Sequence, residues 1–194
     1  MARAARVTYP EPFVAKVLLV TSALDRAGVP YAIGGALAYG YHAEPRGTSD
    51  IDINVFLSDA DARPVIVDLG TIGVAAGEQE IATAIRTGQV RLQLEGTFVD
   101  LFFANHQFHD SCASRSSVVR FDGGAIRILS AEDLVVFKAL FNRGKDWLDI
   151  EQVLRTQAKS FDSEYVLSWL DEMLGPSDSV RIRIAELLAR AGPH

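Results

Sequence analysis

Residues 31–56 read YAIGGALAYGYHAEPRGTSDIDINVF, and this stretch decides the fold. A short apolar run ends at Gly34 and Gly35, and helix-forming residues follow directly. Asp50 and Asp52 then open a second, strand-like run. Because side chains alternate across a strand, the two carboxylates share one face, about 6–7 Å apart, and the intervening apolar residues share the other. The stretch therefore predicts a strand, a tight turn, a helix and an acidic strand.

The two aspartates and the two glycines together indicate a site for a cation and a phosphate. Two carboxylates this close repel each other unless a positive charge lies between them. A hard divalent cation such as Mg²⁺ takes oxygen ligands and keeps water and phosphate oxygens as further ligands. Glycine allows close backbone approach, and the N-terminus of the following helix offers free N–H groups to a phosphate. The alternative is a simple turn followed by an exposed acidic strand edge.

A third carboxylate lies in a hairpin further along the chain. The sequence predicts strands over residues 89–94 and 97–104, joined at Glu95-Gly96. Asp100 lies in the second strand, within the apolar run FVDLFF. A carboxylate in so apolar a strand is costly unless it is paired with a cation or hydrogen-bonded. Asp100 is therefore either a functional group or a solvent-facing aspartate at the hairpin edge.

The glycine pair, followed after roughly a dozen residues by Asp50-Ile51-Asp52, resembles the signature of the nucleotidyltransferase superfamily with the DNA polymerase beta-like core. In that family the glycine turn holds the triphosphate and the aspartates hold metal ions. The resemblance implies Mg²⁺ or Mn²⁺ bound by Asp50, Asp52 and Asp100. It also implies that Asp100 takes the proton from the attacking hydroxyl or positions that hydroxyl through the metal. The commoner turn is Gly-Ser, so Gly35 replaces a serine and one hydroxyl contact to phosphate is lost.

A narrower resemblance rests on two stretches. Arg46 and Thr48, just before the acidic strand, look like the subgroup of AbiEii-type and MenT-like bacterial toxins, which implies nucleotide-binding roles for both. Residues 130–154, SAEDLVVFKALFNRGKDWLDIEQVL, share with that subgroup a Ser-x-Glu-Asp-Leu start, a helix lysine, an arginine and a Lys-Asp-x-x-Asp-Ile segment.

This second match implies further site residues. Lys138 would contact the triphosphate as a point charge, and Arg143 is a weaker candidate for the same contact. Asp146 is the preferred partner in the site, and Asp149 is the second choice. The alternative for Lys138 is an ordinary salt bridge to Asp146 or Asp149.

The predicted fold class is α+β, a nucleotidyltransferase fold with a small mixed or antiparallel sheet flanked by helices and with a C-terminal helical bundle. The core is expected over residues 1–129, and a helical region over 130–194 is expected to pack on it. The remaining predicted elements are helices over 11–28, 36–43, 59–69, 81–87, 134–142, 145–154, 163–174 and 177–191, and a hairpin over 116–129. Ser130 is expected to cap the helix that follows it, and Gly144 is expected to separate the helices on either side of it.

Composition places the chain among ordinary folded proteins of 194 residues, with 48% hydrophobic residues. It has no apolar run of bilayer length and no apolar signal-peptide segment, so no membrane is expected. Its one cysteine, Cys112, fits a reducing cytoplasm. The net charge of −6 argues against binding of nucleic acid through overall charge, although it leaves a local basic patch open.

These features predict an enzyme that moves a nucleoside monophosphate from a nucleoside triphosphate to an acceptor hydroxyl. The resemblance to the toxin subgroup makes the 3′ end of tRNA a candidate acceptor and a cognate antitoxin a candidate partner. The alternative is a catalytically silent module of the same fold that binds nucleotide or docks a partner. The missing serine and the acidic composition favour this alternative, whereas the complete set of carboxylates opposes it.

Overall fold

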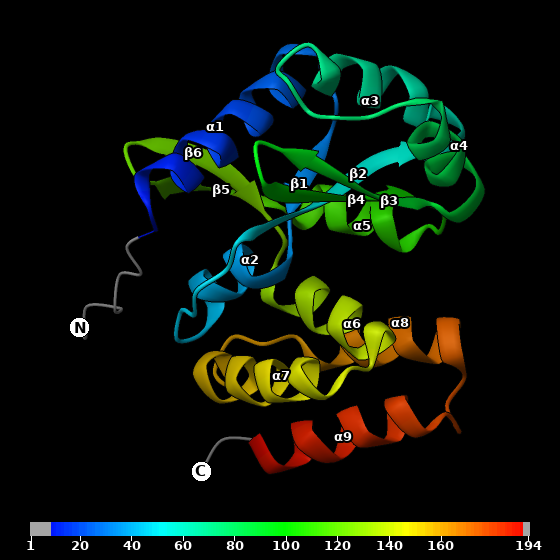
Figure 1. The fold of residues 1–194 in the computed structure, drawn as a ribbon. Coiled ribbons are helices and arrows are strands. Elements are labelled where there is room, and N and C mark those ends of the chain that lie inside the picture. The colour runs from blue at the N-terminus through cyan, green and yellow to red at the C-terminus, as the bar shows by residue number, and fades with distance from the viewer. Residues whose placement is uncertain (1–8, 192–194) are drawn as a thin grey trace. The chain divides into compact units, whose positions relative to one another are not determined.

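A mixed sheet dominates the computed structural model, which describes residues 9–191 of the chain (Figure 1). Within these residues, six strands follow the order β3-β4-β2-β1-β6-β5. The β1–β6 and β2–β4 pairs are parallel, and the β1–β2, β3–β4 and β5–β6 pairs are antiparallel. The strands are β1 (Tyr31–Ile33), β2 (Asp50–Ser58), β3 (Gln89–Leu94), β4 (Thr97–Ala104), β5 (Ser117–Phe121) and β6 (Gly124–Ile128). The mixed sheet flanked by helices confirms the predicted fold class.

The described residues form two compact units. The first, here called the sheet unit, comprises residues 9–37 and 46–129, and the second, the helical unit, comprises residues 38–45 and 130–191. The helix α2 (Gly35–His42) begins in the sheet unit and ends in the helical unit. The predicted packing of residues 130–194 on the core stays a prediction.

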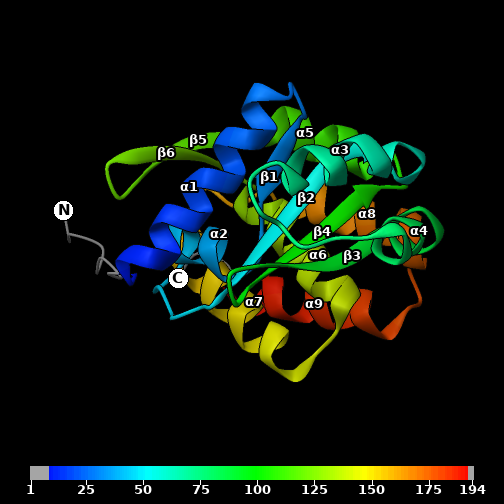
Figure 2. The same cartoon turned by 45° about the horizontal axis from the view of Figure 1, so that its top comes forward.

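The other helices of the sheet unit lie along the sheet. Figure 2, like Figure 1, shows α1 and α3 side by side on one side of it. The prediction of α4 from residue 81 was three residues short, because the carboxylate of Glu80 accepts a hydrogen bond from the Gly77 N–H at 2.8 Å and so begins the helix earlier. These helices are α1 (Glu11–Arg26), α3 (Ala62–Gly70), α4 (Glu78–Thr87) and α5 (Phe108–Arg115), with a 3-10 turn over Asp59–Asp61.

Alternating side-chain directions in β2 and β4 separate a buried apolar face of the sheet from the face that carries the three candidate aspartates. Ile51, Ile53 and Val55 of β2 are completely buried. Their counterparts on β4 are Val99, Leu101 and Phe103, which are also buried. The remaining positions of both strands, which include the three candidate aspartates, point to the opposite face. Burial of the apolar face therefore fixes the direction in which those aspartates point.

The helical unit contains α6 (Ala131–Phe141), α7 (Gly144–Gln157), α8 (Ser163–Leu174) and α9 (Ser179–Ala191). Ser130 caps α6, as predicted: its hydroxyl accepts from the backbone N–H of Asp133 at 3.1 Å and donates to the Asp133 carboxylate at 2.6 Å. The hydroxyl of Tyr165 on α8 donates to the other oxygen of the same carboxylate at 2.6 Å. The buried Asp133 thus links the start of α6 to α8.

The boundary between α6 and α7 differs from the prediction. Asn142, expected as the last residue of α6, lies outside it in a left-handed conformation with φ of 52°, and its N–H donates to the carbonyl of Lys138. Asparagine tolerates this conformation better than most residues, so it can end a helix where glycine usually does. Gly144, expected to separate the two helices, is instead the first residue of α7.

None of the helices within residues 9–191 combines the length and the apolar character that crossing a bilayer requires.

Candidate active site

The turn between β1 and α2 lies against the side chain of Asp52. Gly35 has φ of +51°, and a β-carbon placed on it would lie 1.8 Å from the Oδ2 atom of Asp52. A β-carbon on Gly34 would lie 2.7 Å from Nδ2 of Asn54, and the Gly34 N–H donates to the carbonyl of Asp52 at 2.9 Å. No side chain fits at position 35 while Asp52 keeps this position. The absence of the commoner serine therefore has a physical cause in this chain.

Asp52 consequently lies at the start of α2, where backbone N–H groups have no partner within the helix. The dipole of the helix stabilises a negative charge at this end. A phosphate group would be attracted to the same place by the same N–H groups. A carboxylate and a phosphate can share the position only if a cation lies between them.

The three candidate carboxylates lie on one face of the sheet. Asp52 of β2 and Asp100 of β4 are directly paired in the parallel register, and Asp50 is paired with Phe98. Paired residues on neighbouring strands point to the same face, and so do residues two apart on one strand. The side chain of Asp100 is 13% exposed, so it is not the solvent-facing aspartate of the alternative interpretation.

Arg91 of β3 binds this acidic face, and the sequence analysis missed it. Its Nε and Nη2 atoms donate to the two carboxylate oxygens of Asp100 at 2.7 and 2.6 Å, and Nη2 lies 3.7 Å from Oδ2 of Asp50. Its guanidinium carbon lies 4.6 Å from the centre of the Phe98 ring. The hydrogen bonds to Asp100 raise the pKa of Arg91, and the charges of Asp50 and Asp52 add to this effect.

The register of the hairpin could have revealed this contact. A two-residue turn at Glu95-Gly96 pairs residue 94 with 97, and each step back along β3 matches one step forward along β4. Arg91 is then directly opposite Asp100, as the structure shows. Opposite charges at directly paired positions stabilise a hairpin.

The loop before β2 positions Asp50. The hydroxyl of Thr48 accepts a hydrogen bond from the Asp50 N–H at 3.2 Å and donates one to the Asp50 carbonyl at 3.3 Å. The hydroxyl of Ser49 donates to the Asp50 carboxylate at 3.1 Å. Arg46 lies in the same loop. Burial raises the pKa of Tyr9, and the nearby charge of Arg46 partly offsets this rise. Thr48 thus orients the first aspartate, and the nucleotide contacts expected of Arg46 and Thr48 stay predictions.

The remaining candidates form a separate cluster within the helical unit. Nζ of the buried Lys138 lies 2.6 Å from Oδ2 of Asp149 and 3.5 Å from Oδ1 of Asp146. Nε of Arg143 lies 2.6 Å from Oδ2 of Asp146. The salt bridge considered for Lys138 is therefore present, and it involves both aspartates. Two positive and two negative groups balance each other, and contact of Lys138, Arg143 or Asp146 with a nucleotide stays a prediction.

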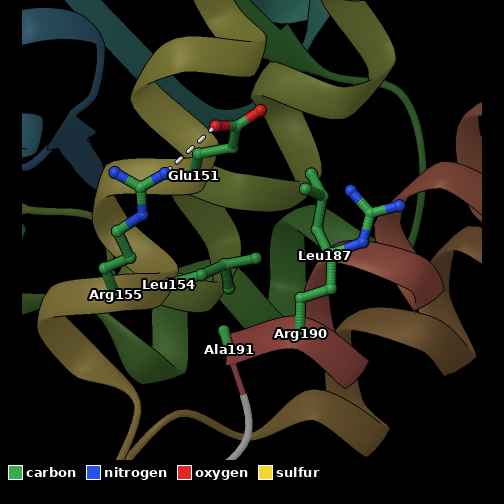
Figure 3. A pocket seen from close by; sticks show the side chains of 6 residues that line it. All are labelled: Glu151, Leu154, Arg155, Leu187, Arg190 and Ala191. Carbon is green, nitrogen blue, oxygen red and sulfur yellow. Dashed lines mark ion pairs between the residues drawn. The ribbon is translucent and has the colours of Figure 1, made fainter.

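A depression between α7 and α9 of the helical unit contains none of these candidates. Figure 3 shows two of its arginines, Arg155 and Arg190, on opposite sides of its apolar floor. Arg155 lies 3.5 Å from the carboxylate of Glu151, and Arg190 lies 3.9 Å from that of Glu186. Each arginine charge already has a carboxylate partner, so the depression gives no reason to place a nucleotide there.

Comparisons with known proteins identify the fold. No family model and no curated protein sequence matches the chain. Among solved structures, the solution structure of the antibiotic-resistance factor ANT(2'')-Ia matches with a TM-score of 0.55 and 18% identity, over 92% of this chain and 97% of that one. The chain has the nucleotidyltransferase fold.

Two further structures agree. The crystal structure of ANT(2'')-Ia in complex with adenylyl-2''-tobramycin has a TM-score of 0.56 at 13% identity, over 89% of this chain and 97% of that one. The lincomycin-bound lincosamide antibiotic adenylyltransferase LnuA has a TM-score of 0.50 at 15% identity, over 76% of this chain and 98% of that one. Identities this low establish the fold alone, and the narrower resemblance to the AbiEii-type and MenT-like toxins stays a prediction.

The nucleotidyltransferase fold raises the question of whether these residues suit a divalent metal ion. Carboxylate oxygens are the ligands that Mg²⁺ and Mn²⁺ prefer, and three carboxylates gather on the acidic face. Within residues 9–191, no three acidic, histidine or cysteine side chains are already arranged as a metal cage. The three aspartates nevertheless supply the kind of ligand atom that these ions take: Asp52 lies against the turn, Asp50 shares its face, and Asp100 is bound to Arg91.

Replacing Gly35 by serine tests whether the turn and Asp52 depend on each other. We expect Gly35→Ser to lower the free energy of unfolding by at least about 1–2 kcal/mol, because the side chain strains a left-handed residue and displaces the Asp52 carboxylate. Gly47→Ser is the matched control, since nothing lies within 4 Å of a β-carbon there. Urea unfolding of both variants gives the comparison, and equal stabilities would contradict the assigned contact.

Replacing Lys138 by methionine tests the cluster of the helical unit. We expect Lys138→Met to cost about 3–5 kcal/mol of folding stability, because Asp149 loses the lysine cation in a buried position and Asp146 keeps only Arg143. Arg155→Met, which removes a cation from an exposed pair with Glu151, should cost no more than about 1 kcal/mol. Urea unfolding measures both changes, and a similar small loss in both would show that the cluster does not support the fold.

Proposed function

We propose that this chain is a nucleotidyltransferase that moves a nucleoside monophosphate from a nucleoside triphosphate to an acceptor hydroxyl. One observation carries the proposal: Asp52, which lies against the Gly35 turn, is directly paired with Asp100 and shares its face with Asp50. A glycine turn at a helix N-terminus is suited to phosphate, and carboxylates beside it are suited to a divalent cation, which is the combination that a metal-bound triphosphate requires. The fold, which ANT(2'')-Ia and LnuA share, supports it.

The chain's own groups divide the work as follows. Backbone N–H groups at the start of α2, from Gly35 onward, bind phosphate oxygens, and Asp50 and Asp52 hold the cation. The acceptor oxygen forms a bond to the α-phosphorus, the bond from that phosphorus to the pyrophosphate oxygen breaks, and Asp100 receives the acceptor proton. Mg²⁺ or Mn²⁺, held by the three carboxylates, would lower the pKa of the acceptor hydroxyl and neutralise the charge that develops on the phosphates.

Four further residues are proposed to assist. Arg46 and Thr48, in the loop before β2, and Lys138 and Arg143, in the helical unit, are candidates for nucleotide contacts. Of the two candidates in the helical unit, Arg143 is the more accessible to a nucleotide. Its side chain is 55% exposed, whereas that of Lys138 is 5% exposed. Asp146 is retained as a candidate site residue, and Asp149 as its alternative.

Two kinds of acceptor are compatible with this chemistry. The resemblance to AbiEii-type and MenT-like toxins favours RNA, in particular the 3′ end of tRNA, and with it a cognate antitoxin as a partner. The net charge of −6 favours a small hydroxylated molecule over a polyanion. The solved structures of the same fold include a complex with adenylyl-2''-tobramycin and one with bound lincomycin. The proposed setting is the cytoplasm, to which the single cysteine is suited.

A second candidate function is a catalytically silent module of the same fold. Two observations favour it: both oxygens of Asp100 are bound by Arg91, and position 35 lacks the serine hydroxyl of the commoner turn. Such a module would bind a nucleoside triphosphate without turning it over. Calorimetry with each triphosphate, with and without Mg²⁺, combined with an assay for pyrophosphate release, separates the two functions.

Isosteric replacement of the aspartates tests the enzymatic proposal. We expect Asp50→Asn and Asp52→Asn each to reduce transfer from α-³²P-labelled nucleoside triphosphates at least about 100-fold, because each removes a negative metal ligand without changing volume. The acceptor panel includes tRNA, aminoglycosides and lincosamides, and each variant is checked for folding by circular dichroism. Asp68→Asn, on the exposed side of α3, is the matched control and should retain full activity.

The outcomes separate the two candidates. Undiminished transfer by both Asp50→Asn and Asp52→Asn would contradict the proposed mechanism. Binding of triphosphate by the unaltered protein, with no pyrophosphate released in the presence of any acceptor, would favour the silent module.

A further inference from the structure

The contact between Arg91 and Asp100 places a cation of the chain itself on the acidic face. Arg91 binds both carboxylate oxygens of Asp100 and lies 3.7 Å from the nearest carboxylate oxygen of Asp50. Bidentate pairs of this kind are among the stronger polar contacts in proteins. The guanidinium therefore occupies the carboxylate that the proposed reaction needs as a metal ligand and proton acceptor.

The surroundings of Arg91 differ from those of a purely structural ion pair. Its side chain is 54% exposed, whereas the cation of the buried cluster, Lys138, is 5% exposed. The guanidinium also lies over the ring of Phe98, which is itself 39% exposed. A long side chain at an open edge of this kind can leave its partner without unfolding the strand that carries it. The exposed Phe98 ring offers the displaced guanidinium a stacking surface.

The charges of the acidic face explain why a cation is needed at this place. Asp50, Asp52 and Asp100 share one face, and two of them are directly paired across neighbouring strands. Without a counter-charge, these carboxylates would repel one another and weaken the pairing of β2 with β4. A divalent cation prefers the same carboxylate oxygens, so it must compete with the Arg91 guanidinium for those of Asp100.

We propose that Arg91 is the positioning residue of Asp100: it holds this carboxylate when no metal is bound and is displaced from it when the metal-bound triphosphate enters. The inference rests on the proposed nucleotidyltransferase function and deepens it. Arginine suits the task better than lysine, because its planar group binds both oxygens at once and stacks on an aromatic ring. The pair thereby keeps Asp100 ordered before the metal binds, and its competition with the metal lowers the affinity for the metal.

Direct measurement of metal binding tests this inference without relying on activity. Mn²⁺ binding is followed by electron paramagnetic resonance of the free ion in the unaltered protein and in Arg91→Gln, Arg91→Lys and Arg86→Gln. Arg86, an exposed residue of α4, is the matched control, because its replacement changes the net charge of the protein equally. Thermal unfolding of each variant with and without Mn²⁺ gives a second readout.

We expect Arg91→Gln to bind Mn²⁺ on the order of 10-fold more tightly than Arg86→Gln, since a unit positive charge next to the ligands is removed. Arg91→Gln should also unfold at a lower temperature without metal and regain more of that loss when Mn²⁺ is added. Arg91→Lys keeps the charge but loses the bidentate contact, so its affinity for Mn²⁺ should lie between those of the unaltered protein and Arg91→Gln. This order of affinities supports displacement of Arg91 by the metal.

Two results would overturn the inference. One of them leaves the proposed function standing, and the other contradicts it as well. If the unaltered protein binds Mn²⁺ in a way that Asp52→Asn abolishes, but Arg91→Gln binds no more tightly than Arg86→Gln, then Arg91 has only a structural role and the proposed function stands. If neither the unaltered protein nor Arg91→Gln binds Mn²⁺ at a site that Asp52→Asn removes, the metal site itself is wrong. The proposed function would then fall with it.

Discussion

The contact between the Asp52 carboxylate and the backbone of Gly35 constrains the whole acidic site. Gly35 adopts a left-handed conformation at the start of α2, and the space that a side chain would need is filled by a carboxylate oxygen. The contact ties the turn after β1 to the first residues of β2, so the N–H groups proposed to bind phosphate and a proposed metal ligand lie side by side. The same contact explains why a glycine, and not the serine of the commoner turn, stands at this position.

Two clusters of charged residues in the chain differ in burial and in the arrangement of their charges. In the helical unit, Lys138 and Arg143 neutralise Asp146 and Asp149. Lys138 and both aspartates are buried. On the acidic face of the sheet unit, the exposed Arg91 binds Asp100 and lies near Asp50. A buried cluster of paired charges supports the fold, whereas carboxylates gathered on an accessible face can attract a cation. This difference supports the proposal that the metal and the triphosphate bind to the sheet unit.

Local sequence signals predicted the parts of the fold that depend on local physics. The alternation in β2, the two-residue turn between β3 and β4 and the Ser130 cap of α6 each depend on neighbouring residues, and all three are present. The end of α6 was predicted less well, because the glycine at 144 is the more familiar signal and the left-handed Asn142 overrides it.

The contacts of the site were only partly predictable. Alternation gave the shared face of Asp50 and Asp52, but the position of Asp100 on that face follows from the parallel pairing of β2 with β4, which no local pattern specifies. The hairpin register could have revealed Arg91, but Arg91 does not belong to any sequence motif that marks it as a site residue. The choice between Asp146 and Asp149 as the partner of Lys138 could not be made, because residues three apart on a helix lie on the same side and both reach the lysine.

A crystal structure of the protein with Mn²⁺ and a nucleoside triphosphate analogue that cannot be hydrolysed would test the proposed site most directly. We expect an anomalous diffraction peak coordinated by Asp50 and Asp52, phosphate oxygens at the Gly34-Gly35 turn, and Arg91 withdrawn from Asp100. A triphosphate bound away from the turn, with no anomalous peak at the two aspartates, would contradict the proposed site.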